Sequence, residues 1–213
     1  MQYILLPLVC LFVGSIYGQQ DGWTVRNYPD PITMPGLCGR VNPSFICDPS
    51  RILEEAAADQ IDEIAKNIYN ETTVPCYASG PRASRRKGYM VMVAVMPKMQ
   101  RYRTVNATVY NMRTRYREAQ YFAYHLGQQK KWGAHSSSCN ETVIILYSAE
   151  DGVLYTSTQS QARRLLTDGI VREKVIWALT LYNPINRNNR VLAHTLEYLV
   201  RQYGLALRAD IAA

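Results

Sequence analysis

The sequence predicts an α/β sandwich, in which a central, mostly parallel sheet ends in a hairpin and carries helices on both faces. A continuous apolar run at 88–97, GYMVMVAVMP, is typical of a strand that is buried on both faces. An amphipathic helix pattern at 115–133 separates this run from the next β-rich run, as in a right-handed parallel crossover. The full order of elements is helix, strand, helix, strand, strand, helix, helix, which gives a small three-layer domain.

The first helix is predicted to begin at Asp48 and to run to about residue 70. Asp48 is a good N-cap, and Pro49 suits the first helical position. One apolar stripe contains Leu53, Ala57, Ile61, Ile64 and Ile68. Acidic residues lie mostly off this stripe, so we expect the helix to pack one face on the sheet.

The helix pattern at 115–133 is followed by two strands. Its inward side carries Ala119, Phe122, Ala123 and Leu126. Gly133 suits the end of this helix. The strands are ETVIILYS at 141–148 and GVLYTST at 152–158. The Asp-Gly pair in the short linker between them is a good hairpin signal.

Helical patterns at 160–181 and 189–204 close the chain. The first of them follows the stretch LYTSTQSQARRLLTD, residues 154–168, where a strand turns into a helix. Such turns often hold phosphate, because the first N–H groups of a helix are free. Hydroxyl groups that could cap the helix instead are those of Ser157, Thr158 and Ser160. The turn has no glycine for a close backbone approach to phosphate, so a structural turn is favoured.

Composition divides the chain into four segments. Residues 1–18 are apolar and uncharged with small residues near their end, which is typical of a secretory signal peptide. Residues 19–47 are rich in proline and glycine and predict an extended arm. The domain is expected at 48–207, with a tail at 208–213. Sequons for N-glycosylation occur at Asn70, Asn106 and Asn140, so the chain is expected outside the cell.

The formal net charge of +7 narrows the class of partner. For an exported protein, acidic glycans, anionic lipid or an acidic protein face fit this charge better than nucleic acid. No stretch after the leader approaches 18 consecutive apolar residues, so no transmembrane span is predicted. The three histidines occur singly, without metal-ligand spacing, and no metal or cofactor is expected.

Four cysteines follow the leader, which suggests two disulfides with three alternative pairings. Cys76 and Cys139 both precede strands that are expected to be parallel, so both should lie near one edge of the sheet. Cys47 begins the helix that leads up to the first strand and is expected at the opposite edge. Because bridged cysteines need Cα atoms within about 7 Å, the favoured pairs are Cys76–Cys139 and, by exclusion, Cys38–Cys47.

Several segments resemble one protein family in the same order along the chain. They are CDPSRILEEAAADQIDEI, VAVMPKM, REAQYFAYHLGQQKKWG, TVIILYS and LYTSTQSQARRLLTD. Over residues 36–204 the chain is similar to the nematode modulator of levamisole receptor family, whose extracellular part is a TPM domain. The resemblance implies an α/β sandwich and an auxiliary subunit that modulates an acetylcholine-gated cation channel from outside the cell. The namesake type carries a transmembrane helix after this domain, so this chain is expected to be secreted or cut short.

The resemblance also implies an enzymatic alternative. Other TPM-domain proteins are linked to phosphatase activity, which is thought to use carboxylates near strand ends, and these correspond here to Asp151 and Asp168. A calcium or magnesium site needs about six converging oxygens, and the sequence identifies only two carboxylates. A hairpin position and a helix-terminal position explain them more simply. A non-enzymatic protein is therefore favoured, with a soluble secreted binding protein as the third alternative.

The predicted partner-binding surface is the basic, tyrosine-rich stretch at 98–117. Its named residues are Arg101, Arg103, Arg113, Arg115, Tyr116 and Arg117. Arginine and tyrosine are favoured at protein interfaces, although a solvated basic loop is an equally good interpretation. By analogy, the ligand-binding face of such receptors is often acidic. A second basic segment at 82–87 matches an Arg-x-x-Arg processing pattern ending at Arg85, where a flexible loop is the favoured interpretation.

Overall fold

Four strands form one sheet in the order β1-β2-β3-β4. The computed structural model describes residues 22–77, 88–101, 111–130, 132, 139–181 and 189–208. The strands are β1 Ile46–Cys47, β2 Met90–Met96, β3 Thr142–Ser148 and β4 Val153–Thr158. Strands β1, β2 and β3 run parallel, and β4 runs antiparallel to β3 at the edge. This is the predicted sheet with one additional strand, β1.

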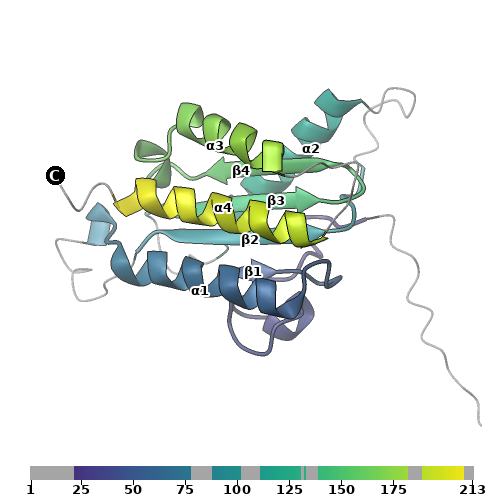
Figure 1. Ribbon diagram of the computed structural model, residues 1–213, viewed down its shortest axis with the longest axis horizontal. Helices are drawn as coiled ribbons and strands as arrows, with labels where there is room; N and C mark the ends of the chain where they lie inside the picture. Colours follow the sequence, from purple (N-terminus) through teal and green to yellow (C-terminus); the bar gives the residue numbers. More distant parts are fainter. Residues whose placement is uncertain are drawn as a thin grey trace, which may run out of the picture.

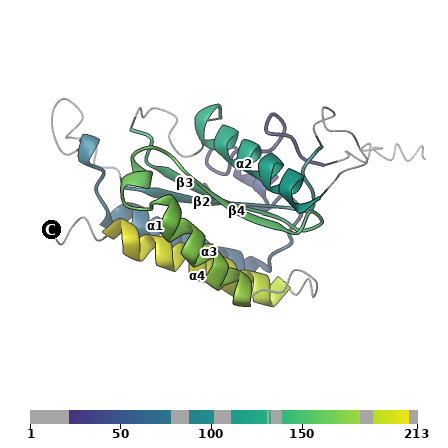
Figure 2. The same ribbon diagram turned by 90° about the horizontal axis from the view of Figure 1, so that it is seen from above.

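Helices cover both faces of this sheet. They are α1 Glu55–Glu71, α2 Met112–Gln128, α3 Asp168–Leu181 and α4 Asn189–Arg208. Figure 2 shows α2 on one face and α1, α3 and α4 on the other. On that second face α4 runs between α1 and α3 (Figure 1). The predicted three-layer α/β sandwich is confirmed.

Strands β2 and β3 form the centre of the core. Every residue of both strands is buried, which is the pattern of a strand covered on two faces. The two strands pair in register from Met90 opposite Thr142 to Met96 opposite Ser148. Each fully buried valine, isoleucine or leucine in such strands stabilises the fold by about 1.5–3 kcal/mol. Burial on two faces therefore explains the continuous apolar run at 88–97.

Helix α1 begins at Glu55, and the prediction that it begins at Asp48 was wrong. Asp48 does accept a backbone hydrogen bond, but within a loop, where its Oδ2 accepts the N–H of Leu53 at 2.7 Å. Burial raises the pKa of Asp48, and hydrogen bonds from the backbone of this loop oppose the rise. Aspartate is favoured in such loops for the same reason that it is favoured at an N-cap. Of the predicted stripe, Ile61 and Ile68 are buried in the helix.

Helix α2 has the predicted inner side but different ends. Its buried residues include Ala119, Phe122, Ala123 and Leu126, as predicted. The helix begins at Met112, where the side chain of Asn111 accepts the N–H of Thr114 at 3.1 Å and caps the first turn. The helix ends at Gln128. Gly133, the predicted end, lies outside the described residues.

Strand β4 returns through the predicted Asp-Gly turn, with Gly152 at φ 63°, a conformation that costs glycine little. Helix α4 then covers the sheet and is longer than predicted, ending at Arg208. The buried side of α4 includes Leu192, Leu196, Leu199, Val200 and Tyr203. The hydroxyl groups of Tyr203 and Thr156 of β4 are hydrogen-bonded at 2.9 Å, which fixes α4 against the edge strand.

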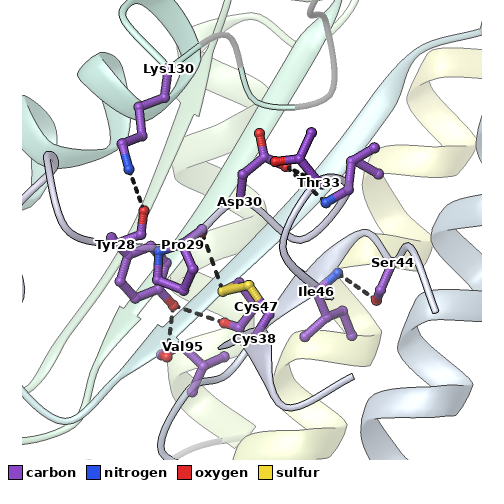
Figure 3. Close-up of a disulfide and its surroundings, with 11 residues drawn as sticks. Tyr28, Pro29, Asp30, Thr33, Cys38, Ser44, Ile46, Cys47, Val95 and Lys130 are labelled. Carbon is purple, nitrogen blue, oxygen red and sulfur yellow. Dashed lines mark hydrogen bonds between the residues drawn. A yellow bond between two sulfur atoms is a disulfide. The ribbon is translucent and has the colours of Figure 1, made fainter. Parts of the chain in front are cut away.

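The N-terminal arm passes around the β1 edge of the sheet. Tyr28 is fully buried and packs against an aromatic ring of α2. Its hydroxyl lies 2.8 Å from the carbonyl oxygen of Cys47 and 2.9 Å from that of Val95 (Figure 3). Farther along the arm, Arg40 forms an ion pair with Asp59 of α1, on the opposite face. The arm therefore contacts both helical layers and also supplies strand β1.

Two disulfides join Cys38 to Cys47 and Cys76 to Cys139, the pairs that the sequence favours. Each pair has one cysteine in a short 3-10 helix, Pro35–Cys38 or Pro75–Tyr77. Cys47 lies in strand β1 and not at the start of a helix, so that part of the reasoning was wrong. The Cα atoms of Cys38 and Cys47 are 4.4 Å apart (Figure 3), and those of Cys76 and Cys139 are 6.2 Å apart.

Candidate functional site

The first two turns of α2 carry a basic, partly aromatic surface. The α2 outer surface consists of Met112, Arg113, Tyr116 and Arg117, all of which are exposed. Residues three and four apart on a helix are neighbours, so Tyr116 and Arg117 both lie beside Arg113. Arginine and tyrosine are the side chains that contribute most to binding at protein interfaces. Three of the six predicted partner-binding residues, Arg113, Tyr116 and Arg117, therefore share one exposed surface.

Arg115 has a different role from its neighbours on α2. Its side chain is half-buried, and Nη1 donates a hydrogen bond to the carbonyl oxygen of Asp151 at 3.0 Å. This contact joins α2 to the β3–β4 hairpin. Glu118, the one acidic residue in α2, is buried. The α2 outer surface therefore presents positive charge without a neighbouring carboxylate from its own helix.

Helix α1, on the opposite face of the sheet (Figure 2), is acidic. The exposed acidic residues of α1 and its N-cap are Glu54, Glu55, Asp59 and Glu63. Helices α1 and α2 cover different faces of the sheet (Figure 2). An acidic partner would thus be attracted to the α2 outer surface and repelled by α1, which gives an encounter a preferred orientation.

Two predicted partner-binding residues lie in the segment before α2. Arg101 is exposed and follows the end of β2. Arg103 lies outside the described residues, as do Asn106, the predicted signal peptide at 1–18 and the basic segment at 82–87. The structure therefore brings together only the α2 members of the predicted surface.

The turn after β4 does not cradle an anion through its backbone. The N–H of Gln159 donates to the carbonyl oxygen of Thr142 at 3.0 Å, and that of Arg163 donates to Gln159 at 2.8 Å. The N–H groups of Gln161 and Ala162 both donate to the carbonyl oxygen of Asn140. Because these N–H groups already form hydrogen bonds within the protein, they are not free to bind a phosphate.

The capping hydroxyls expected in this turn also occupy other positions. Thr158 belongs to β4, as does Ser157, and helix α3 begins only at Asp168, after the 3-10 helix Ala162–Arg164. The hydroxyl of Thr167 accepts the N–H of Ile170, in the first turn of α3, at 3.4 Å. Thr167 therefore takes the capping position that the sequence assigned to Ser157, Thr158 or Ser160.

Asp151 and Asp168, the carboxylates of the phosphatase alternative, lie at opposite ends of β4. Asp151 is buried in the hairpin before this strand. Asp168 is exposed at the start of α3 and lies 3.5 Å from Arg163, which in turn donates to Thr158 at the far end of β4. The strand is six residues long, or roughly 17 Å. The structure therefore does not bring these two carboxylates into one site.

Two of the three sequons lie in the described part of the chain. Asn70 is exposed in the last turn of α1, and Asn140 is half-buried between Cys139 and β3. The threonines of both sequons, Thr72 and Thr142, are fully buried. Glycan attachment at these positions stays a prediction.

The described residues contain neither a candidate metal-binding cluster nor a candidate membrane-spanning helix. In those ranges no three His, Cys, Asp or Glu side chains are grouped as they would be to ligate a metal ion. No helix there combines the length and the apolar composition that crossing a bilayer requires.

Sequence reasoning missed the aromatic continuation of α2. Tyr121 and Tyr124 are exposed on the next turns, and the ring of His125 lies 4.0 Å from that of Tyr121 between centroids. Tyr121 follows Arg117 by four residues and Tyr124 follows Tyr121 by three, so this spacing could have indicated that the two rings share the exposed side.

The chain has the fold of a known class of α/β-sandwich domains. It superimposes with a TM-score of 0.56 on the solution NMR structure of the N-terminal domain of a protein from P. gingivalis. The two sequences are 12% identical, and the match covers 90% of this chain and 95% of that one. At this identity the likeness shows the fold alone. No curated protein matches the chain.

A match to a family model assigns the chain more specifically than its fold does. The family model described as Modulator of levamisole receptor-1 matches residues 23–152. The chain belongs to this family. The match contains the arm, the sheet up to the β3–β4 hairpin and the whole of α2, including its outer surface.

Proposed function

We propose that this protein is an extracellular, non-enzymatic auxiliary protein that binds an acetylcholine-gated, levamisole-type cation channel and changes its response to agonist. The observation that carries the proposal is the family match over residues 23–152. The two disulfides support an extracellular location, because such bonds persist in oxidising compartments.

The α2 outer surface is the proposed contact with the channel. It combines two exposed arginines with Tyr116 and lacks an exposed carboxylate on its own helix. A modulator must bind the resting and open states of a channel with different affinity, because equal binding to both states shifts nothing. We therefore expect an acidic patch on the channel whose position differs between these states.

The experiment is agonist-evoked current from a levamisole-type receptor expressed in oocytes, with and without this protein. The protein is supplied as the 213-residue chain and as a fusion to a transmembrane anchor. We expect either form to shift the current or the agonist sensitivity. No shift, with the protein confirmed at the surface or in the medium, would contradict the channel proposal and favour a soluble binding protein.

Charge reversal tests the α2 outer surface separately. The double variant R113E/R117E should lose most of the shift, because it turns two attractive charges into repulsive ones. A matched control, R164E/R172E, makes the same change in net charge at two exposed arginines outside α2. If R113E/R117E keeps the full effect, channel binding stands and the contact lies elsewhere on the protein.

A further inference from the structure

We infer that a hollow between α2 and the turn after β4 binds a sugar residue. The hollow has a volume of about 220 Å³ and lies beside the C-terminal half of α2. Pockets for drug-sized molecules have volumes of about 300–1,000 Å³, so this one suits a single ring. The α2 outer surface lies at the other end of the helix, and the inference does not rest on the proposed channel contact.

The floor of the hollow is apolar and depends on a glycine. Ala123 and Gly127 of α2 and Ile144 of β3 line it. A Cβ atom on Gly127 would lie 2.6 Å from Nε2 of Gln159 and 3.4 Å from Cδ1 of Ile144. The missing side chain at position 127 therefore lets the amide of Gln159 lie against the helix.

The walls of the hollow carry neutral hydrogen-bonding groups. Gln159 is only 8% exposed, and it lines the hollow beside Gly127. A side-chain amide offers two donors and an acceptor, so Gln159 can form hydrogen bonds with hydroxyl groups of a ligand in the hollow. Gln128, Ser157 and Ser160 add a second amide and two hydroxyl groups.

The charge in the hollow is already largely compensated. Arg163 donates through Nε to the hydroxyl of Thr158 at 3.1 Å and through Nη2 to its carbonyl oxygen at 3.0 Å. The carboxylate of Asp168 lies 3.5 Å from the same Nε. With the backbone N–H groups of Gln159, Gln161, Ala162 and Arg163 also used, a phosphate would find little to replace its hydration. A neutral ligand with many hydroxyl groups fits these groups better.

An aromatic ring completes the arrangement. Tyr124 lines the hollow and is 52% exposed, so its ring offers a flat surface beside the amides and hydroxyls. A sugar ring presents an apolar C–H face and polar edges, which match an aromatic surface and amide or hydroxyl groups respectively. This combination identifies the ligand class as a saccharide.

Saturation-transfer difference NMR tests the inference. The full chain is secreted into a bacterial periplasm, so that it carries no glycans of its own, and is titrated with glucose, galactose, mannose and N-acetylglucosamine. We expect at least one sugar to bind with a millimolar dissociation constant and to remain bound when inorganic phosphate is added at the same concentration. Displacement by phosphate, or no binding of any of the four sugars, would overturn the inference.

Two exposed substitutions locate the binding without disturbing the core. Tyr124→Ala should weaken sugar binding by about tenfold, since it removes the aromatic surface. Ser160→Trp should abolish binding by filling the mouth of the hollow from an exposed position. The matched control is Tyr121→Ala, at a residue that is 43% exposed on the same helix and does not line the hollow. Full affinity in either test variant, or an equal loss in the control, would place the sugar elsewhere.

Discussion

Oδ2 of Asp151 accepts the backbone N–H of Met99 at 2.8 Å and so joins the β3–β4 hairpin to the segment after β2. The same oxygen accepts the hydroxyl of Ser148 at 2.5 Å. Arg115 of α2 donates to the carbonyl oxygen of Asp151 at 3.0 Å. Asp151, a candidate catalytic residue in the sequence analysis, therefore joins three segments: the β3–β4 hairpin, the segment after β2, and α2.

This arrangement predicts that Asp151 and Asp168 contribute unequally to stability. Asp151→Ala should lower the free energy of unfolding by about 2–3 kcal/mol, because buried donors of Met99 and Ser148 lose a charged acceptor. Asp168→Ala should change it by no more than about 0.5 kcal/mol, because Asp168 is exposed. The midpoints of urea unfolding measure both effects. Equal losses of stability would contradict the structural role assigned to Asp151.

The elements that could be predicted from the sequence are those with a long, regular pattern of apolar residues. Strand β2 is one uninterrupted apolar run, and α2 repeats apolar residues at helical spacing over several turns. Strand β1, by contrast, has only two residues, Ile46 and Cys47, and so has no period to detect. It exists because the arm passes β2 at that point.

The residue types at positions 48 and 49 also led to a wrong prediction of where α1 begins. The Asp48-Pro49 pair has the composition of a helix start, yet the carboxylate of Asp48 binds a loop N–H instead. The same residue type satisfies both arrangements, so composition could not distinguish them.

The hollow beside α2 could not be predicted from the sequence for a different reason. It depends on Gly127 and Gln159, which come together only when the helix packs on the sheet.

Buried tyrosines predict a loss of stability at alkaline pH. Burial raises the pKa of Tyr28, the Asp48 carboxylate adds to the rise, and the hydrogen bond with Val95 opposes it. Burial also raises the pKa of Tyr203, against the effect of its hydrogen bond with Thr156. The unfolded chain releases these protons near pH 10, whereas the native state keeps them. The free energy of unfolding should therefore fall above about pH 10, by up to about 1.4 kcal/mol per pH unit for each tyrosine.

The variant Tyr28→Phe separates the contribution of that one hydroxyl. At neutral pH it should lower the free energy of unfolding by about 1–2 kcal/mol, because the carbonyl groups of Cys47 and Val95 lose a donor. Between pH 9 and pH 11 its stability should fall less steeply than that of the wild type. Guanidinium unfolding at each pH gives both values, with the exposed Tyr121→Phe as control. A slope equal to the wild-type slope would mean that Tyr28 ionises in the native state.

The two disulfides should differ in access to a reductant. Cys38 and Cys47 are both fully buried, whereas Cys76 is half-buried. A thiolate must reach a sulfur atom to exchange with it, so limited dithiothreitol on the native protein should open Cys76–Cys139 first. Alkylation followed by peptide mass spectrometry identifies the reduced pair. Earlier labelling of Cys38 or Cys47 would show that the arm opens before the rest of the domain.

The approach of α1 to the start of β2 predicts that position 88 tolerates only glycine. A Cβ atom on Gly88 would overlap the carbonyl oxygen of Tyr69 in α1 and would lie 2.6 Å from Oγ1 of Thr72. That hydroxyl cannot move freely, because it donates to the carbonyl oxygen of Ile68 at 2.7 Å and accepts the N–H of Tyr89 at 2.9 Å.

Gly88→Ala must therefore displace the end of α1 from the strand, and it should lower the free energy of unfolding by about 3 kcal/mol or more. The control is Gly36→Ala, since a Cβ atom on Gly36 has no neighbouring atom within 4 Å. Urea unfolding followed by circular dichroism measures both variants. If the two variants proved equally stable, then α1 and β2 would not pack as closely as the structure shows, and the position of α1 on the sheet would need revision.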